Sequence, residues 1–242
     1  MKIIKKIKDK AEGIYTIRQP VIAFSGDSVT QGCFDLYLKD GEVIETFFDS
    51  LESYAEKVKK IFSLLFPSAN ITIVNAGLSG CRAETGSERL KSDILSCNPD
   101  LTVVCYGLND ANQKQEGLET YKESLKKIFR DLKDAGSEVI FMTPNMCTSR
   151  IDYSTKEKGV QAAAERVSQT VNEGWLDKYI EIAIQVCKEE KIPVCDCYGM
   201  WKTMYSGGVD ITSLLSNKVN HPTKEMHWMF AYELVKTMFE NE

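Results

Sequence analysis

Two side chains in this sequence form a nucleophile and a base if the fold brings them together. Ser28 closes the stretch Phe24-Ser25-Gly26-Asp27-Ser28, directly after an apolar run. The chain has only two histidines, and His221 lies in a predicted loop while His227 falls inside a predicted helix. A neutral imidazole can take the proton of a serine hydroxyl as its oxygen attacks a carbonyl carbon. We therefore expect His221 to be the base and His227 to be a packed or surface residue.

Polar or glycine-rich turns also follow two other apolar runs. Asn109 lies in Gly107-Leu108-Asn109-Asp110, where its side-chain amide can donate to a negatively charged oxygen. Gly77 and Gly80 follow another run and let the backbone approach a ligand closely. A helix that begins near Ser28 would add free backbone N–H groups, including that of Ser28 itself. The competing roles are a flexible turn at the two glycines and a turn or helix N-cap at Asn109 or Asp110, against an oxyanion-binding site beside the serine.

Five short, β-branched apolar runs must position these turns. Such runs suit parallel strands that are covered on both faces. They are Val21–Ser25, Ile71–Asn75, Leu101–Cys105, Glu138–Thr143 and Ile192–Cys195. Helical patterns alternate with them, which predicts a doubly wound α/β fold, a three-layer αβα sandwich with about five parallel strands. The functional loops should then lie at the carboxyl ends of the strands.

Helix signals set the expected boundaries. Apolar residues from Leu51 to Leu65 share one helix face, with a capping start predicted at Asp49 and Glu52. Similar patterns predict helices over 118–132, 175–186 and 223–239. We expect one domain over residues 1–242, with an N-terminal extension over 1–18. The long polar segment 144–174 is the candidate for a lid or substrate-shaping insertion.

Composition excludes several classes of partner. Hydrophobic residues make up 43% and charged residues 27%, and the net charge of −5 argues against nucleic acid binding. No apolar run approaches the roughly 20 residues that cross a bilayer, and the N-terminus lacks the apolar core of a secretory signal. We therefore expect a cytoplasmic protein with eight reduced cysteines. Cys195 and Cys197 have C-x-C spacing, but without a second pair we expect a strand end and no metal or cofactor.

The motifs occur in the order found in the GDSL/SGNH hydrolase family, which the chain resembles from Gly26 to Pro222. Gly26-Asp27-Ser28 matches the block with the nucleophile, Ser79-Gly80 the second block, Gly107-Leu108-Asn109-Asp110 the G-x-N-D block, and His221-Pro222 the block with the base. The resemblance implies the family's flavodoxin-like sandwich and an oxyanion hole. Its donors would be the backbone N–H groups of Ser28 and Gly80 and the side chain of Asn109.

One position departs from this pattern. The family's last block is D-x-x-H, and the residue three before His221 is Lys218, which cannot accept the Nδ1–H of an imidazole. Three replacements stay open: a backbone carbonyl near Lys218, Asp210 in the preceding loop, or Asp196 after the fifth strand. For both aspartates, turn and cap chemistry is the competing role and the one we favour. A dyad without an acid should have a histidine of lower pKa than a triad. We expect weak to moderate activity that rises through near-neutral pH.

The resemblance implies a serine esterase that hydrolyses small acyl esters, and we favour acetyl groups on carbohydrate. The alternatives are an acyltransferase of the same fold and a non-catalytic glycan-binding module. The side chains considered for an apolar or sugar-stacking site are Tyr37, Phe47, Phe48, Trp175 and Trp201, for most of which core packing is the competing role. Arg82 is considered for an anionic substrate, against a surface salt bridge.

Overall fold

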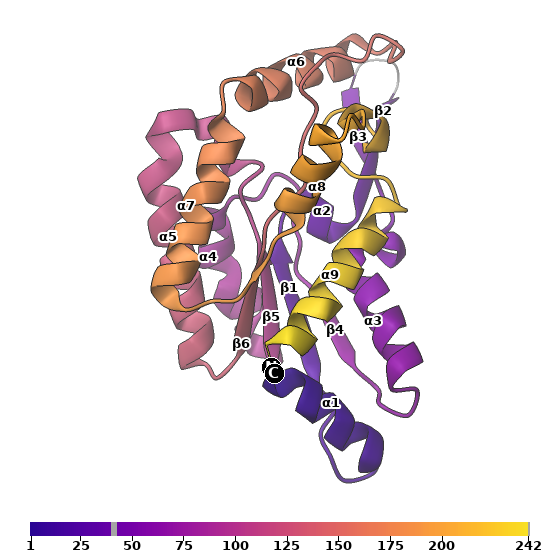
Figure 1. Ribbon diagram of the computed structural model, residues 1–242, viewed down its shortest axis with the longest axis vertical. Coiled ribbons are helices and arrows are strands. Elements are labelled where there is room, and N and C mark those ends of the chain that lie inside the picture. Colours follow the sequence, from indigo (N-terminus) through magenta and orange to yellow (C-terminus); the bar gives the residue numbers. More distant parts are fainter. Residues whose placement is uncertain (40–42, 242) are drawn as a thin grey trace.

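Five parallel strands form the central sheet of this computed structural model, which describes residues 1–39 and 43–241. They lie in the order β4-β1-β5-β6-β7 (Figure 1). Their bounds are Val21–Gly26 for β1, Thr72–Asn75 for β4, Leu101–Cys105 for β5, Glu138–Met142 for β6 and Val194–Cys195 for β7. Each strand overlaps one of the five apolar runs, so the predicted α/β fold is confirmed.

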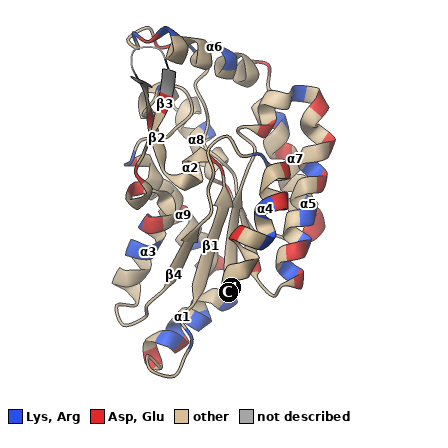
Figure 2. Ribbon diagram, turned by 180° about the vertical axis from the view of Figure 1, so that it is seen from behind, with Lys and Arg blue, Asp and Glu red and all other residues tan. Residues whose placement is uncertain are grey.

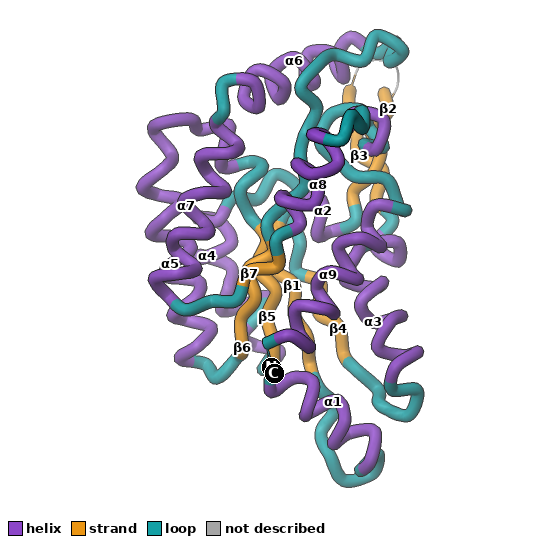
Figure 3. The backbone as a smooth tube through the Cα atoms, in the orientation of Figure 1, coloured by secondary structure: helices purple, strands orange, loops and turns teal. Residues whose placement is uncertain are grey.

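The strand register brings three loops to one edge of the sheet. Gly26, which ends β1, lies opposite Cys105, which ends β5. On the other side of β1, Phe24 pairs with Asn75, the last residue of β4. The carboxyl ends of parallel strands therefore meet, and the three motifs that follow them gather at that edge, among the loops drawn in teal at the upper end of the sheet (Figure 3).

Helices cover both faces of the sheet and complete the three layers (Figure 1). One layer contains α3 (Tyr54–Leu65) and α9 (Met226–Glu240), and both α1 (Lys2–Glu12) and α8 (Cys197–Ser206) contact α9. The other layer contains α4, α5 and α7, of which α5 contacts both of the others. Their bounds are Ala83–Asp93, Leu118–Asp134 and Trp175–Glu190. Short 3-10 helices are η1 (Ser50–Glu52), η2 (Leu95–Cys97), η3 (Asp110–Gly117) and η4 (Ile211–Leu214).

Helix α5 shows why the apolar periodicity was informative. Its buried face consists of Tyr121, Leu125, Ile128, Phe129 and Leu132. Burying one leucine, isoleucine or phenylalanine side chain contributes roughly 1.5–3 kcal/mol relative to leaving it exposed. The helix ends at Asp134, two residues before Gly136, whose φ of +82° suits a glycine.

The predicted start of α3 was wrong. The N-cap is Ser53, whose hydroxyl accepts the Glu56 N–H at 3.4 Å. Asp49 instead forms an ion pair with Lys224 at 2.5 Å, and Leu51 is exposed rather than part of the apolar face. The competing signals lie within four residues, and the serine is the one followed by an uninterrupted helix.

Sequence reasoning also missed a hairpin that lies outside the main sheet. Strands β2 (Cys33–Lys39) and β3 (Val43–Phe48) pair antiparallel in a sheet of their own. Leu36 lies opposite Thr46 in that register. These strands mix charged and apolar residues, so no continuous apolar run marked them.

The segment 144–174 contains helix α6 (Lys158–Asn172), which crosses above the carboxyl ends of the strands (Figure 1). The N-terminal extension contains α1, whose Ile3, Ile4 and Ile7 are buried while four of its five lysines are exposed. Figure 2 shows the lysines of α1 as blue segments of the helix. The division into one domain with these two additions stays a prediction.

All eight cysteines are free thiols, and seven of them are buried. The Sγ atoms of Cys195 and Cys197 lie 3.7 Å apart at the end of β7. Within residues 1–39 and 43–241, no three His, Cys, Asp or Glu side chains are grouped to hold a metal ion, and no helix has the length and apolarity that a bilayer span needs. The cytoplasmic location stays a prediction.

Candidate functional site

Ser28 lies at the first position of α2 (Ser28–Gln31), two residues after β1. Asp27 is the N-cap, and its carboxylate accepts the Val29 N–H at 2.9 Å. Gly26 makes this sharp turn possible, because a Cβ there would lie 2.0 Å from the Thr30 hydroxyl oxygen. The local sequence therefore holds the serine at the N-terminus of a short helix, at the edge of the sheet where ligands bind.

The structure brings His221 to Ser28. The imidazole Nε2 lies 3.0 Å from the serine Oγ, although the residues are far apart in sequence. The loop that holds the histidine is organised by Asn217, whose side-chain oxygen accepts the backbone N–H groups of Val219, Asn220 and His221 at 2.9–3.0 Å. This buried asparagine was not predicted from the sequence. The signal that could have found it is an asparagine directly before Lys218, the position that departs from the family's last block.

The other imidazole nitrogen contacts a backbone carbonyl. His221 Nδ1 lies 3.2 Å from the oxygen of Phe34 in β2. A carbonyl oxygen only accepts, so Nδ1 carries the proton and the unprotonated Nε2 faces the serine hydroxyl. This is the tautomer that a general base needs. The carbonyl comes from the hairpin that the sequence did not predict, and not from the neighbourhood of Lys218.

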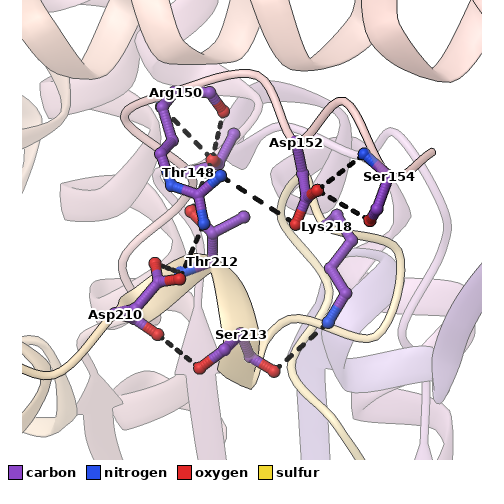
Figure 4. Close-up of polar contacts among 8 residues, drawn as sticks. All are labelled: Thr148, Arg150, Asp152, Ser154, Asp210, Thr212, Ser213 and Lys218. Atoms are coloured by element: carbon purple, nitrogen blue, oxygen red, sulfur yellow. Dashed lines mark hydrogen bonds and ion pairs between the residues drawn. The ribbon is translucent and has the colours of Figure 1, made fainter.

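Neither aspartate proposed to orient His221 contacts it. The Asp210 carboxylate accepts the Thr212 N–H at the start of η4 and pairs with Arg150 at 2.6 Å (Figure 4). Lys218 has a left-handed backbone, with φ of +58°, and its Nζ donates to the carbonyl of Ser213. The side chain at the family's usual acid position therefore contacts η4, and the Phe34 carbonyl is the group at His221 Nδ1.

Asp196 has a capping role after β7, the strand at one side of the sheet. Its carboxylate accepts the Gly199 N–H and the Thr143 hydroxyl, both at 3.0 Å. The two acid alternatives are therefore wrong as orienting groups. In each case the carboxylate accepts a backbone N–H at the start of the next helix, which is the usual role of aspartate at such positions.

Burial controls the protonation of this histidine. His221 is 5% exposed, and desolvation lowers its pKa to about 4. The hydrogen bond to the Phe34 carbonyl and the charge of Asp35 oppose this fall but do not cancel it. His221 is therefore neutral across the near-neutral range. The rise of activity that the sequence led us to expect near neutral pH should instead occur at lower pH.

Hydrogen-bond donors line the cleft at Ser28. Within the described residues, no acceptor is bonded to the backbone N–H of Ser28 or of Gly80. Gly80 has φ of +75°, which favours glycine, and no atom lies within 4 Å of where its Cβ would be. The Asn109 amide donates to the Cys81 carbonyl at 3.1 Å and makes a long 3.4 Å contact with Asp27. All three residues line the same cleft.

Two buried carboxyl groups lie behind these donors, and the sequence did not single them out. Burial raises the pKa of Asp27 to about 7, and the nearby Asp110 adds to the rise. Burial likewise raises the pKa of Asp110 to about 6. Asp110 accepts the N–H groups of Ala83 and Gly107 at 2.9 and 3.0 Å, so it ties the start of α4 to the loop after β5.

The cleft in front of Ser28 has a volume of about 600 Å³. His221 and Asn109 line the cleft together with Ser28. Leu36 and Thr46 of the hairpin line it as well, and so do residues of α6. Many other lining side chains are neutral and polar: Ser79, Asn112, Gln169, Thr170 and Asn220. The space suits a small polar molecule that offers several hydroxyl groups.

His227 is a structural residue, as expected. It is fully buried, and its Nδ1 accepts the Tyr54 N–H at 3.0 Å. Its ring packs against those of Phe34, Tyr54 and Phe230. Burial lowers the pKa of His227 to about 3.

The other substrate-binding candidates lie outside this cleft. None of the five aromatic residues considered for stacking lines it, and Trp201 is fully buried in the core. The hydroxyl of Tyr37 donates to Glu45, and the indole N–H of Trp175 donates to Glu173. Arg82 pairs with Glu84 at 3.6 Å.

Comparison with known proteins extends these observations. Residues 24–229 match the model of the GDSL-like lipase/acylhydrolase family. An acetylxylan esterase from Geobacillus stearothermophilus is 25% identical over 132 residues, which are 51% of this chain and 58% of that protein. The chain spans somewhat over half the length of the curated relatives it matches.

Solved structures show the same fold. A lipase/acylhydrolase from Enterococcus faecalis superimposes with a TM-score of 0.67 at 22% identity, covering 91% of this chain and 95% of the other. A two-domain esterase active on acetylated mannans superimposes with a TM-score of 0.67 at 18% identity, covering 98% of this chain and 52% of the other. The family match spans most of the chain, so the predicted family and its sandwich fold are confirmed. The chain belongs to the GDSL-like lipase/acylhydrolase family, a family of ester hydrolases.

Proposed function

We propose that this protein is a serine esterase that removes small acyl groups, above all acetyl groups, from carbohydrate. One observation supports catalysis most directly: the Ser28 hydroxyl lies 3.0 Å from an imidazole nitrogen whose partner nitrogen is held by a carbonyl. A glycan-binding module would have no need of this tautomer. The hydrogen bond therefore favours an enzyme over the non-catalytic alternative.

The reaction follows from the geometry. Ser28 Oγ attacks the ester carbonyl while His221 Nε2 takes the hydroxyl proton, and His221 then protonates the leaving alcohol oxygen. Backbone N–H groups of Ser28 and Gly80 and the Asn109 amide stabilise the oxyanion. Water, deprotonated by His221, attacks the acyl-serine and releases the acid. The imidazolium is stabilised by a neutral carbonyl instead of a carboxylate, so turnover should be lower than in a triad.

The substrate class rests on two supports. The relatives with named activities include an acetylxylan esterase and an esterase active on acetylated mannans. The cleft in front of Ser28 is rich in neutral hydrogen-bonding side chains, which suit sugar hydroxyls. Acetylated sugars therefore fit this site better than long acyl chains.

The test measures hydrolysis of 4-nitrophenyl acetate by the wild type, by Ser28→Ala and by His221→Ala. We expect both variants to lose activity by at least about a thousandfold, since removing either member of a nucleophile–base pair abolishes its shared function. Ser63→Ala, on the surface of α3, is the matched control and should keep wild-type activity. A fluorophosphonate should label Ser28 in the wild type.

Two outcomes would reject the proposal. Full activity in Ser28→Ala would mean that another group attacks the ester, and no activity in the folded wild type would favour the binding module. Adding an acceptor alcohol separates the esterase from the acyltransferase, because a transferase would form the new ester in place of acetate. We expect acetate to be the main product.

A further inference from the structure

The charged side chains that line the cleft are both cations in the part of the chain that the structure describes. They are Lys114, from η3, and Arg166, from α6. No described aspartate or glutamate lines the same space. The whole chain has a net charge of −5, so the composition does not account for this local sign. A cleft with one sign of charge concentrates ligands of the other sign.

Arg166 lies on the face of α6 that is turned to the cleft. Ala163, Val167 and Thr170 line the same space, and their spacing of three, four and seven residues places them along one side of the helix. These three neighbours are short and uncharged. Arg166 is therefore the one long, charged side chain on this face.

The guanidinium of Arg166 has no hydrogen bond or ion pair with any residue in 1–39 or 43–241. The chain has six arginines, and each of the other five pairs with an acid. These pairs are Arg18–Asp100, Arg82–Glu84, Arg89–Asp93, Arg130–Glu190 and Arg150–Asp210. Guanidinium N–H groups match a carboxylate in a bidentate geometry. Arg166 keeps all of its donors for a ligand.

The helix that presents Arg166 is anchored at both ends. Near its start, Val160 and Ala164 pack against Val219, which adjoins the loop of His221. At its end, the Asn172 side chain donates to the Ser149 carbonyl at 2.9 Å. Arg166 therefore lines the cleft from a supported helix, and α6 crosses above the carboxyl ends of the strands (Figure 1).

Lys114 supplies a second, weaker positive charge at the cleft. Its Nζ pairs with Glu173 at 2.8 Å, and both side chains are about two-fifths exposed. Ion pairs exposed to this degree contribute little, so a ligand can compete for the lysine. The Lys114 backbone has φ of +48°, and the Tyr179 hydroxyl donates to its carbonyl at 2.8 Å. The residue is thus held in a conformation that lysine rarely adopts.

We propose that the preferred substrate of this site is an ester whose alcohol part bears a carboxylate, such as an acetylated uronic acid residue. The inference rests on the proposed esterase function and names its substrate class. The acyl group lies at Ser28, and the carboxylate of the alcohol part is bound by Arg166, with Lys114 nearby. Because this contact is remote from the reacting carbonyl, it acts on binding and so on KM more than on kcat.

The test compares two acetyl esters of nearly the same shape, 4-acetoxybenzoate and the neutral 4-acetoxybenzamide. The measured quantity is the ratio of kcat/KM for the anionic over the neutral ester. We expect Arg166→Gln to lower this ratio about fivefold, equivalent to about 1 kcal/mol. Arg150→Gln is the matched control, an arginine of the same segment that pairs outside the cleft, and should leave the ratio unchanged. Raising the ionic strength from about 0.02 M to about 0.5 M should lower the wild-type ratio more than that of Arg166→Gln, which keeps only the weaker charge of Lys114.

The possible results separate this inference from the function beneath it. If the wild type cleaves the neutral ester but Arg166→Gln keeps the wild-type ratio, the anionic preference is wrong and the esterase stands. If Arg150→Gln lowers the ratio as much as Arg166→Gln does, the specific role of Arg166 is rejected. If neither ester is cleaved by the folded protein, both proposals fail.

Discussion

Protonation of His221 is the perturbation that tests the site most directly. The base must be unprotonated to accept the serine proton, so activity is lost as pH falls through its pKa. Burial lowers that pKa from 6.5 to about 4, and the orienting group is the Phe34 carbonyl, which brings no negative charge. We therefore expect kcat/KM to stay on its plateau well below pH 6 and to halve near pH 4.

The size of the effect is easily measured. Lowering the pKa of His221 from 6.5 to about 4 corresponds to about 3 kcal/mol of preference for the neutral imidazole. At pH 5, roughly 90% of the histidine is neutral with a pKa of 4, against about 3% with a pKa of 6.5. Retained activity at pH 5 would then differ about thirtyfold between a buried dyad and an unperturbed histidine.

Two assays report on the same proton. The first is kcat/KM for an aryl acetate from pH 3.5 to 8, with circular dichroism at each pH. The second is NMR titration of the histidine Cε1–H signals, of which the chain has two, from His221 and His227. His221→Ala identifies its own signal by removing it.

The fold must be followed because acid also destabilises it. Both histidines have folded pKa values below that of the unfolded chain, near 6.5, so their contribution to stability is lost as pH falls from about 6.5 toward 4 and 3. A titration near 6.5 of the signal that His221→Ala removes, or a kcat/KM that halves near 6.5 while the fold persists, would refute the reasoning.

Three more substitutions test particular contacts. Asn109→Ala should lower kcat for an aryl acetate by about a hundredfold without unfolding, because one oxyanion donor is lost; a change below threefold would remove Asn109 from the oxyanion hole. His227→Ala should lower the free energy of unfolding by about 2–4 kcal/mol, since it leaves a cavity and an unpaired Tyr54 N–H. Denaturant titration measures this change, and a fully active variant with wild-type stability would contradict the structural role of His227. Lys218→Asp should leave the acid limb of the pH profile in place, because the side chain at 218 contacts η4 while the Phe34 carbonyl occupies Nδ1 of the imidazole; a limb that moved up toward 6.5 would show that an acid there reaches Nδ1.

The main sheet and the motifs could be predicted from sequence because their signals are local. Strands buried on both faces require continuous apolar runs, and parallel strands bring their carboxyl ends to one edge whatever lies between them. That reasoning located Ser28, Gly80 and Asn109. Because the chain has two histidines and His227 falls inside a predicted helix, His221 was the only histidine predicted to lie in a loop.

The partners of those residues depended on contacts that no local pattern encodes. The group that orients His221 is a main-chain carbonyl, which every residue has, so no side-chain type could indicate that Phe34 supplies it. The hairpin that presents it mixes polar and apolar residues and pairs only with itself. Asp210 and Asp196 were plausible by type and wrong by position, because each carboxylate caps the next helix.

The sequence by itself determined the layers of the fold and the chemical groups that gather at one sheet edge. Tertiary structure decided the tautomer and low pKa of His221, and the unpaired state of Arg166 above the cleft. Desolvation and charge pairing depend on everything within a few ångströms of a group, from any part of the chain. Such surroundings exist only after distant segments have packed together.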